Sequence, residues 1–378
     1  INKNFLLIKF FNLTRNKIFN KLLKIENFFF RKRGVDIIMP IYDGVSQTYE
    51  AIESVVNSSL KTFENKNNIL YLGIDNPKNI QMRNMIFRNF SDHPRIRIFI
   101  NKKNLGFVLN TNKLFEKSRK NFDKLIINSD VKVPINYWLN DLKNLSDNDE
   151  QIGTITPISN SATIFSFPVP NVSQEYNFQY SIEDLNKLIA LVKHKKIYDV
   201  PSCHGFCFFI ANSKLRLKKI FNPDFGLGYG EENELSMKIL KRGFRNVLYP
   251  NTFIYHKESV SFKNIPKVDE YKIRNMEYLN KIYPNYNKSV SLFIEEDIFN
   301  KFQKIFLIKI IKDTLINNKK CILHISHLRG GGTNKYIEDY ASENKKFLHF
   351  LLTPGDSNGN FNILFFNKNK FSKTNCYL

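Results

Sequence analysis

Hydrophobic positions follow two alternating patterns between residue 34 and about residue 145. Short apolar, β-rich runs predict strands, and after each run the apolar positions repeat every three or four residues, which predicts a helix. Four such repeats predict an α/β fold with a mostly parallel, doubly wound, Rossmann-like sheet and helices on both faces. The predicted strands are 35–41, 69–74, 95–100 and 124–128, and the predicted helices are 46–56, 82–90, 107–117 and 135–145.

The pattern divides the chain into four parts. Residues 1–33 predict a basic amphipathic helix, 34–262 the main α/β domain, 263–318 a helical extension, and 319–378 a partial second Rossmann-like unit. The last part reads as a strand, a glycine turn at 330–333 that could hold a phosphate, a helix and a strand. About sixty residues are too few to complete such a unit, and the chain starts at Ile1, so we expect a piece of a longer polypeptide.

The chain has 378 residues and a formal net charge of +22. Such a charge would suit nucleic acid, because Lys and Arg neutralise phosphates. However, Lys, Asn, Ile and Phe are abundant along the whole chain, which is typical of a compositional bias, and we expect no nucleic-acid partner. The basic helix over residues 1–33 would lie on an anionic membrane surface or pack on protein, and the sequence leaves both open.

Apolar runs and cysteines limit the class further. No apolar run approaches the roughly 18 residues of a membrane span. Four cysteines (Cys203, Cys207, Cys321 and Cys376) make no disulfide framework in a chain of this length. We therefore expect a cytoplasmic protein with, at most, peripheral contact to the inner face of the plasma membrane.

Acidic residues follow three of the predicted strands, at Asp43, Asp75 and Asp130. Ligands of doubly wound sheets bind beyond the carboxyl ends of the strands, so these carboxylates would share one edge. A single Asp after a strand is as often a turn or capping residue. Gly106 lies between the third strand and its helix, where backbone can approach a ligand closely.

A second acidic group lies in the sequence YGEENE, residues 229–234, directly after Gly226, Gly228 and Gly230. The glycines allow a sharp turn, and a helix follows through residues 235–240. Carboxylates at a helix amino terminus are stabilised by its unpaired amides. The group is therefore either an ordinary helix start or a set of reactive carboxylates.

A series of motifs occurs in a fixed order along the chain: PIYD (40–43), IDN (74–76), NLGFVLNTN (104–112), NSD (128–130), PSCHGFCFFI (201–210), FGLGYGEENELSMKILKRGF (225–244) and a later His256. This order resembles the family-2 glycosyltransferases. The resemblance covers roughly residues 34–262 and is greatest to the branch that builds bacterial surface polysaccharides, including rhamnosyltransferase-like members. It implies a GT-A fold and inverting transfer of a sugar from a UDP-, dTDP- or GDP-sugar to a saccharide or lipid-linked acceptor. Residues 319–378 are similar to the start of GT-B glycosyltransferases.

The resemblance implies a set of donor-binding residues. Asp75 would contact the nucleotide base, Asp43 with the adjoining backbone would contact the base and ribose, and the Gly106 loop would lie on the diphosphate side. The predicted donor set is Pro40, Tyr42, Asp43, Asp75, Gly106, Phe107, Asn110, Asn128 and Asp130.

The resemblance also implies a divalent cation, Mn or Mg. In the family an Asp-x-Asp motif and a later His hold the metal that bridges the diphosphate. Asp130 matches the second Asp and His256 the later His, whereas Asn128 replaces the first Asp. An imidazole ligand favours Mn over Mg. Alternatively, His256 points into the domain and only packs.

On the acceptor side, the resemblance places Glu232 at the position of the general base, which is usually Asp, and Glu231 at the neighbouring acidic position. A carboxylate base takes the proton of the attacking hydroxyl. Cys203, His204 and Gly230 are predicted to line the acceptor side. A zinc site around the two cysteines of this segment lacks a second ligand pair at the usual spacing.

Other interpretations remain open. A glycosidase needs two carboxyl groups about 5 to 9.5 Å apart on either side of one bond, which neighbouring helical residues do not provide. Because of Asn128 and of Glu at the base position, a noncatalytic nucleotide- or carbohydrate-binding module is the alternative. Trp138 has helical spacing with Leu142, which favours packing over sugar stacking.

Overall fold

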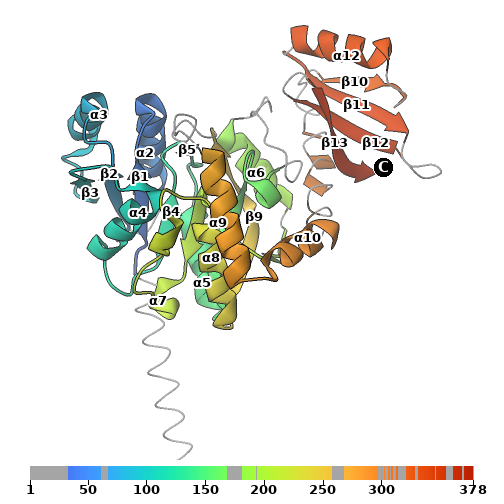
Figure 1. Cartoon of the computed structure of the whole chain (residues 1–378). Coiled ribbons are helices and arrows are strands. Elements are labelled where there is room, and N and C mark those ends of the chain that lie inside the picture. Colours follow the sequence, from blue (N-terminus) through green and yellow to red (C-terminus); the bar gives the residue numbers. More distant parts are fainter. Residues whose placement is uncertain are drawn as a thin grey trace, which may run out of the picture.

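The structure is a computed structural model in which an α/β body is followed by a smaller C-terminal unit (Figure 1). It describes residues 33–60, 67–167, 181–192, 194–257, 268–296, 321–327, 331–344, 346–354, 361–367 and 370–377, with isolated positions between 299 and 313. The predicted helix over residues 1–33 lies almost wholly outside this range, as does the first part of the predicted glycine turn. Within the described residues, no helix has both the length and the apolar character needed to cross a membrane.

The first half of the large sheet consists of four parallel strands in the order β3-β2-β1-β4. Three helices connect them, as the hydrophobic pattern predicts. The strands are β1 (Asp36–Ile41), β2 (Ile69–Ile74), β3 (Ile96–Ile100) and β4 (Lys124–Ile127), and the helices are α2 (Val45–Ser59), α3 (Ile80–Phe90) and α4 (Gly106–Lys117).

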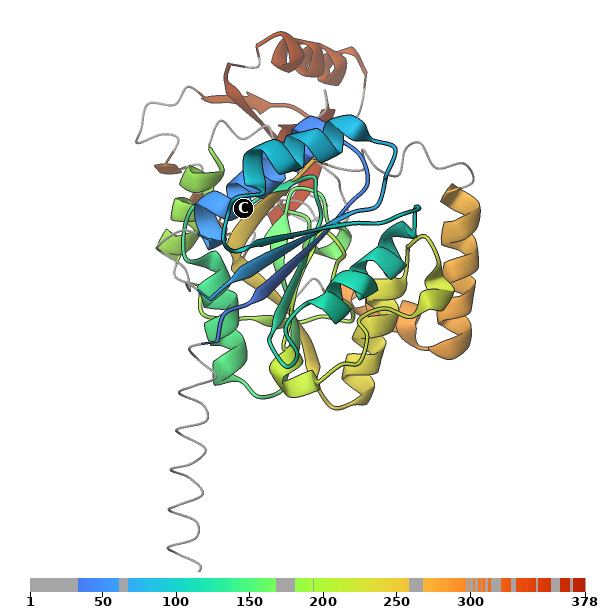
Figure 2. The ribbon, with the colours of Figure 1, turned by 90° about the vertical axis from the view of Figure 1, so that its left-hand side faces the viewer.

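Alternate residues of β1 face two different hydrophobic cores. Ile37, Met39 and Ile41 pack with residues of α2 and α3, whereas Ile38 packs with residues of α4. Since successive side chains of a strand point to opposite faces, helices cover both faces of the sheet, as Figure 2 shows. The predicted α/β class with a doubly wound sheet is confirmed.

The second half of the sheet is mixed. β8 (Cys207–Ile210) pairs antiparallel with β4 and with β6 (Ile152–Ser159), and β9 (Arg245–His256) runs parallel to β6. The short strands β5 (Val131–Lys132) and β7 (Tyr198–Asp199) pair antiparallel with β9. The remaining elements of this half are α5 (Trp138–Asn148), η1 (Thr163–Phe165), α6 (Ile182–Val192), α7 (Asn212–Leu215), η2 (Pro223–Phe225) and α8 (Glu231–Lys241).

In this half the structure corrects one sequence prediction, the start of a strand, and agrees with another, the packing of Trp138. The strand predicted over residues 201–210 begins only at Cys207, because the backbone before it binds α8: the Cys203 N–H donates to Ser236 Oγ at 2.9 Å. Trp138 lies in the core as predicted, fully buried, and its indole N–H donates to Ser58 Oγ at 2.9 Å.

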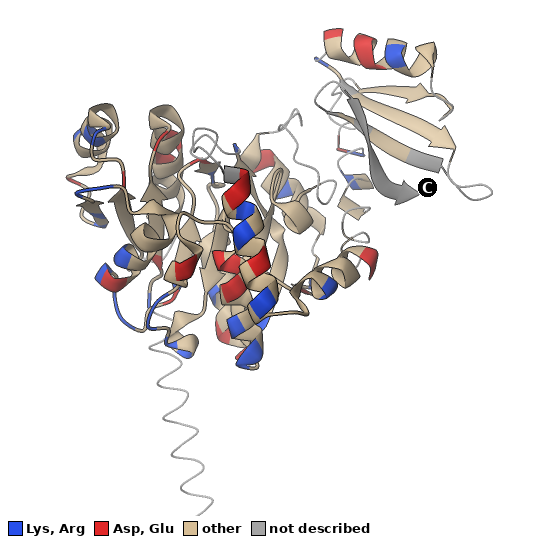
Figure 3. Ribbon diagram, in the orientation of Figure 1, with Lys and Arg blue, Asp and Glu red and all other residues tan. Residues whose placement is uncertain are grey.

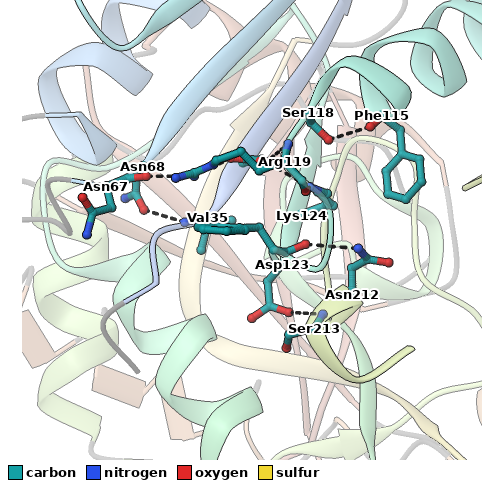
Figure 4. Close-up of polar contacts among 12 residues, drawn as sticks. Val35, Asn67, Asn68, Phe115, Ser118, Arg119, Asp123, Lys124, Asn212 and Ser213 are labelled. Carbon is teal, nitrogen blue, oxygen red and sulfur yellow. Dashed lines mark hydrogen bonds and ion pairs between the residues drawn. The ribbon is translucent and has the colours of Figure 1, made fainter. Parts of the chain in front are cut away.

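The amino ends of β1 and β4 are held by buried charges. Asp36 is fully buried and pairs with Lys124 Nζ at 2.9 Å and with Arg119 at 2.5 Å. Figure 4 shows this end of the sheet, where the Ser213 N–H also donates to Asp123. Because these ion pairs lie at the opposite ends of the strands from Asp43 and the other strand-end acids, they serve the fold and leave the carboxyl edge to other chemistry.

The C-terminal part begins with α9 (Val268–Ile282) and α10 (Tyr286–Glu296). A strand, a glycine-led helix and a second, parallel strand follow, as the sequence predicts. An unpredicted antiparallel hairpin then completes a four-stranded sheet in the order β10-β11-β12-β13. The elements are β10 (Cys321–Ile325), α12 (Gly332–Glu343), β11 (Leu348–Pro354), β12 (Phe361–Asn367) and β13 (Lys370–Tyr377).

Candidate active site

The three predicted strand-end acids lie at one edge, because β1, β2 and β4 are parallel and adjacent. Asp43 follows β1, and its Oδ1 accepts hydrogen bonds from the Gly44 N–H at 2.8 Å and from Asn79 Nδ2 at 3.3 Å. Tyr42 is half-buried beside it, whereas Pro40 lies within β1 and is buried. This edge is therefore built from short loops that follow the strands.

Asp75 is buried and binds the loop that precedes α4. Its Oδ1 accepts from Asn101 Nδ2 at 2.7 Å and from the Leu105 N–H at 2.9 Å, and its Oδ2 accepts from the Gly106 N–H at 2.8 Å. Burial raises the pKa of Asp75, and these hydrogen bonds oppose the rise. The carboxylate thus fixes the position of the Gly106 loop.

A network of amides extends from Asp75 into α4. Asn101 Nδ2 also donates to Asn110 Oδ1 at 2.9 Å, and Asn110 Nδ2 donates to the Gly73 carbonyl at 2.9 Å. Lys113 Nζ donates to Asn101 Oδ1 at 2.6 Å. The predicted donor residue Asn110 is therefore committed to contacts within the protein.

The Gly106 loop contacts the glycine-rich segment that precedes α8. Gly106 has φ +79°, and a Cβ there would lie 2.9 Å from Leu227 Cδ2 and 3.2 Å from its Cα. Phe107, the next residue, packs on Phe221 with ring centroids 5.7 Å apart. The two loops named by the sequence are thus in direct contact, and Gly106 is required for it.

Asp130 and His256 come together although they are far apart in sequence. β5 follows Asp130 directly and pairs with the end of β9, which places His256 Nε2 3.5 Å from Asp130 Oδ1. Asp130 Oδ1 is buried and accepts no hydrogen bond from the described residues. Asn128, two residues earlier, is half-buried and donates its N–H to the Phe206 carbonyl at 2.9 Å.

The His256 ring is oriented by the end of β6. Its Nδ1 lies 2.7 Å from the Ser161 carbonyl, which requires the proton on Nδ1 and makes Nε2 the atom that faces Asp130. Asn160 holds the His256 backbone on both sides, accepting from its N–H at 2.8 Å and donating to its carbonyl at 2.9 Å. A ring N–H fixed by a carbonyl is the usual outer support of a metal-bound imidazole.

This pair fits a divalent cation. A buried carboxylate oxygen without a hydrogen-bond donor, facing an imidazole nitrogen, is the type of donor set that such an ion takes. In the described residues no group of three or more His, Cys, Asp or Glu side chains is arranged to hold a metal. An ion here would therefore have two protein ligands, with the remaining positions left to water or to phosphate oxygens.

Glu231 and Glu232 open α8. The Oε2 atoms of both are buried and accept no hydrogen bond from the described residues. Burial raises the pKa of Glu231 well above its ordinary value, and the charge of Glu232 adds to the rise. Burial also raises the pKa of Glu232, but hydrogen bonds from the backbone N–H groups of Glu232 and Gly230 lower it. Of the two carboxyls, Glu232 therefore ionises more readily.

The segment 203–206 joins the glutamates to the Asp130–His256 pair. A Cβ on Gly205 would lie 3.9 Å from Glu232 Cδ and Oε1. On the other side, the Phe206 ring stacks on His256 with centroids 5.6 Å apart. One short segment therefore lies next to both Glu232 and the Asp130–His256 pair.

The predicted acceptor-side residues differ in their surroundings. His204 accepts the Phe206 N–H on Nδ1 at 3.3 Å, and burial with the nearby His256 lowers its pKa to about 3, so it is a neutral imidazole with its proton on Nε2. Cys203 is buried in the core with its thiol against Ser236 Oγ at 3.2 Å, and burial raises its pKa. Its contacts are those of a packing residue, in contrast to the predicted acceptor contact.

Several residues of the site were not predicted from the sequence. Asn101, Asn160 and Ser161 support Asp75 and His256 through the hydrogen bonds described above. Asn275 of α9 donates to carbonyls of the glycine-rich segment. Asn and Ser are frequent in this chain and carry no spacing signal, so only the tertiary structure identifies them.

Comparisons with known proteins give fold-level likenesses. No protein-family model and no curated protein matches the chain. Among solved structures it is similar to the mannosyltransferase PcManGT from Pyrobaculum calidifontis in complex with GDP-Man and Mn2+, with a TM-score of 0.47 and 13% identity over 82% of this chain and 79% of that one. It is also similar to GalNAc-T7 with UDP, GalNAc and Mn2+, with a TM-score of 0.48 and 14% identity over 75% of this chain and 57% of that one.

Proposed function

We propose that the protein is an inverting glycosyltransferase that moves a sugar from a nucleotide-diphosphate-sugar to a hydroxyl of a saccharide or lipid-linked acceptor. One observation carries the proposal: Asp130, Glu231 and Glu232 each hold a buried carboxylate oxygen without a hydrogen-bond partner among the described residues, and segment 203–206 lies next to both Glu232 and His256. Unpaired buried oxygens are costly and call for a ligand. A cation bound with a diphosphate would be the ligand of Asp130, and an acceptor hydroxyl would be the ligand of the two glutamates.

The base is Glu232. The acceptor oxygen attacks the anomeric carbon, the new carbon–oxygen bond forms as the bond to the diphosphate breaks, and the hydroxyl proton passes to the Glu232 carboxylate. The backbone N–H groups that lower its pKa keep this carboxylate available as a base. Burial and the charge of Glu232 raise the pKa of Glu231 well above its ordinary value, so Glu231 would act in its protonated form and donate a hydrogen bond to the acceptor. Two adjacent carboxyl groups in different environments would thus have different roles, one as the base and one as a hydrogen-bond donor.

Asp130 and His256 would hold a divalent cation, Mn in preference to Mg because one ligand is an imidazole. When bound, such an ion stabilises negative charge on the departing diphosphate. Asn128 in place of an acid leaves fewer charged ligands, so the ion would depend more on the phosphates. His204, neutral with its proton on Nε2, is available as a further donor beside this charge.

The donor nucleotide would lie across the loops after β1, β2 and β3. Asp43 and Tyr42 would contact the base and ribose, and Asp75 would lie beside the base. Asp75 would also anchor the Gly106 loop on the diphosphate side. Because the motif order resembles family-2 glycosyltransferases, we propose a role in bacterial surface polysaccharide synthesis, in the cytoplasm and peripherally at the inner face of the plasma membrane. The sugar would be a hexose or deoxyhexose.

The test is transfer or hydrolysis of UDP-, dTDP- and GDP-sugars with Mn present. Glu232→Gln should lower turnover at least about 100-fold, the scale of general-base catalysis, while donor binding remains. Glu234→Gln is the matched control: its Oε2 is likewise buried without a described partner, but its Oε1 pairs with Lys238 at 2.8 Å, and turnover should stay close to that of wild type. Asp130→Ala should weaken Mn binding, and Asn128→Asp should strengthen it. Donor binding without turnover in wild type would instead identify a noncatalytic binding module.

A further inference from the structure

We propose that Asn275 of α9 is a positioning residue that holds the turn before Glu232, residues 225–230, in its active geometry. The inference rests on the proposed function, because it concerns how Glu232 is placed. Nothing in the sequence motifs points to α9, which lies beyond residues 34–262, the part of the chain whose motif order resembles family-2 glycosyltransferases.

Asn275 contacts three backbone carbonyls of this turn. It is 1% exposed, and its Nδ2 donates to the carbonyls of Phe225 at 2.9 Å, Gly228 at 2.8 Å and Tyr229 at 3.0 Å. The Phe225 carbonyl also accepts the Gly228 N–H at 3.2 Å, so Asn275 adds a second donor there and bridges it to the Gly228 and Tyr229 carbonyls. Buried carbonyls are rarely left without a donor, so this one amide ties three points of the turn together.

The neighbouring residue of α9 fixes the orientation of the amide. Arg274 donates to Asn275 Oδ1 from Nε at 3.1 Å and from a terminal nitrogen at 3.0 Å. Because the oxygen is bound by a guanidinium, the NH2 group must face the turn. The outer side of α9 carries intermixed acidic and basic residues (Figure 3), whereas Asn275 is directed inward.

The turn needs such a restraint because its backbone is unfavourable. Tyr229 has φ +70°, a conformation that non-glycine residues rarely adopt, and Gly230 follows with φ +94°. The Tyr229 carbonyl is one of the three that Asn275 binds. Without this contact the turn would be free to relax, and the Gly230 N–H would move away from the Glu232 carboxylate.

Other titratable groups also face Glu232. Glu231 lies beside it on α8, Tyr229 precedes it in the turn, Cys203 comes from the segment before β8, and Tyr286 comes from α10. Of these residues only Tyr229 contacts Asn275, and it does so through its backbone carbonyl rather than through its phenol group. A change at Asn275 therefore acts on Glu232 through the backbone of the turn.

The experiment compares Asn275→Ala with Asn280→Ala, an asparagine of the same helix whose Oδ1 has no hydrogen-bond partner among the described residues. Displacing a catalytic group by about 1 Å can cost about 100-fold in rate, so Asn275→Ala should lower kcat by about that factor with donor Kd changed less than about three-fold. Loss of the Gly230 N–H from Glu232 should move the acid limb of the pH profile to higher pH. Asn280→Ala should leave kcat and the profile unchanged.

Two further variants keep the test decisive if Asn275→Ala fails to fold. Arg274→Ala, at an exposed position, should produce the same shift to a smaller extent, and Asn275→Asp should be at least as harmful as Ala because it sets a carboxylate against three carbonyls. Wild-type kcat and pH profile in all Asn275 and Arg274 variants that fold, with Glu232→Gln inactive, would overturn the inference and leave the proposed function standing. Full activity of Glu232→Gln would overturn the function itself.

Discussion

Replacing Asp75 by Asn tests whether the Gly106 loop is held as the structure shows. The amide oxygen can take the place of Oδ1 and keep its bonds to Asn101 and to the Leu105 N–H. The NH2 group then faces the Gly106 N–H, which the wild-type Oδ2 binds at 2.8 Å, so two donors meet. The Gly106 N–H keeps a second acceptor in Asn104 Oδ1 at 2.9 Å.

The expected cost follows from these contacts. A hydrogen bond to a charged group contributes about 1.5–3 kcal/mol. Two effects reduce the loss. Asn104 still accepts the Gly106 N–H, and a neutral amide does not carry the cost of burying a charge, which is what raises the pKa of Asp75. Asp75→Asn should therefore destabilise the protein by about 1–2 kcal/mol, whereas Asp75→Ala, which removes all three bonds, should cost about 3–5 kcal/mol.

Urea unfolding measures both values, with fluorescence of Trp138, the single tryptophan of the sequence, as the probe. Asp92→Asn is the control, since Asp92 is exposed and such surface changes stay within about 0.5 kcal/mol. Both Asp75 variants should also bind nucleoside diphosphates more weakly. If Asp75→Asn is as stable as wild type, or costs more than Asp75→Ala, the account of the loop is wrong.

Three further predictions concern single contacts. Gly106→Ala should destabilise the protein by about 1–2 kcal/mol because of its positive φ, and further because of the clash with Leu227. Gly243→Ala, with a similar φ but nothing within 4 Å of its Cβ, should show only the cost of the positive φ, and equal urea midpoints for the two variants would contradict the Leu227 contact. Because the raised pKa of Glu231 makes the folded protein hold a proton that the unfolded chain releases above pH 4.5, stability should fall with rising pH by up to about 1.4 kcal/mol per unit. Glu231→Gln should flatten that slope in urea midpoints measured from pH 5 to 8, and an unchanged slope would refute it. Lys124→Met should destabilise the protein by about 2–3 kcal/mol, less than the loss of an isolated buried ion pair, because Asp36 remains paired with Arg119. If thermal unfolding shows the variant to be more stable than wild type, the Lys124–Asp36 pair does not stabilise the fold.

The first half of the fold follows from local sequence, because each strand is a short apolar run and each helix has a repeating apolar face. β6, in contrast, contains Gly153, Thr154, Thr156 and Pro157, so its pattern does not stand out, yet it is buried throughout. The β12–β13 hairpin was missed for a similar reason, since polar residues interrupt β13. In these segments pairing with neighbouring strands, rather than local pattern, decides the structure.

The site shows the same division. The positions of Asp43, Asp75 and Asp130 at one edge follow from strand order, which the alternating pattern predicts. The approach of His256 to Asp130 depends on the pairing of β5 with β9, which no local signal indicates. Cys203 was expected near the acceptor from its place in a motif, but its direction depends on Ser236 of α8, which lies 33 residues later.

Neutral amides do much of the positioning around these loops. Asn101 and Asn110 hold the loop after β3, Asn160 holds His256, and Asn275 holds the turn before Glu232. An amide neither gains nor loses a proton between acidic and alkaline conditions, and its hydrogen bonds are not weakened by counterions as exposed ion pairs are. The geometry of the loops should thus persist across ionic strength and acidity, so that solution conditions act on the protein through its few buried carboxyl groups.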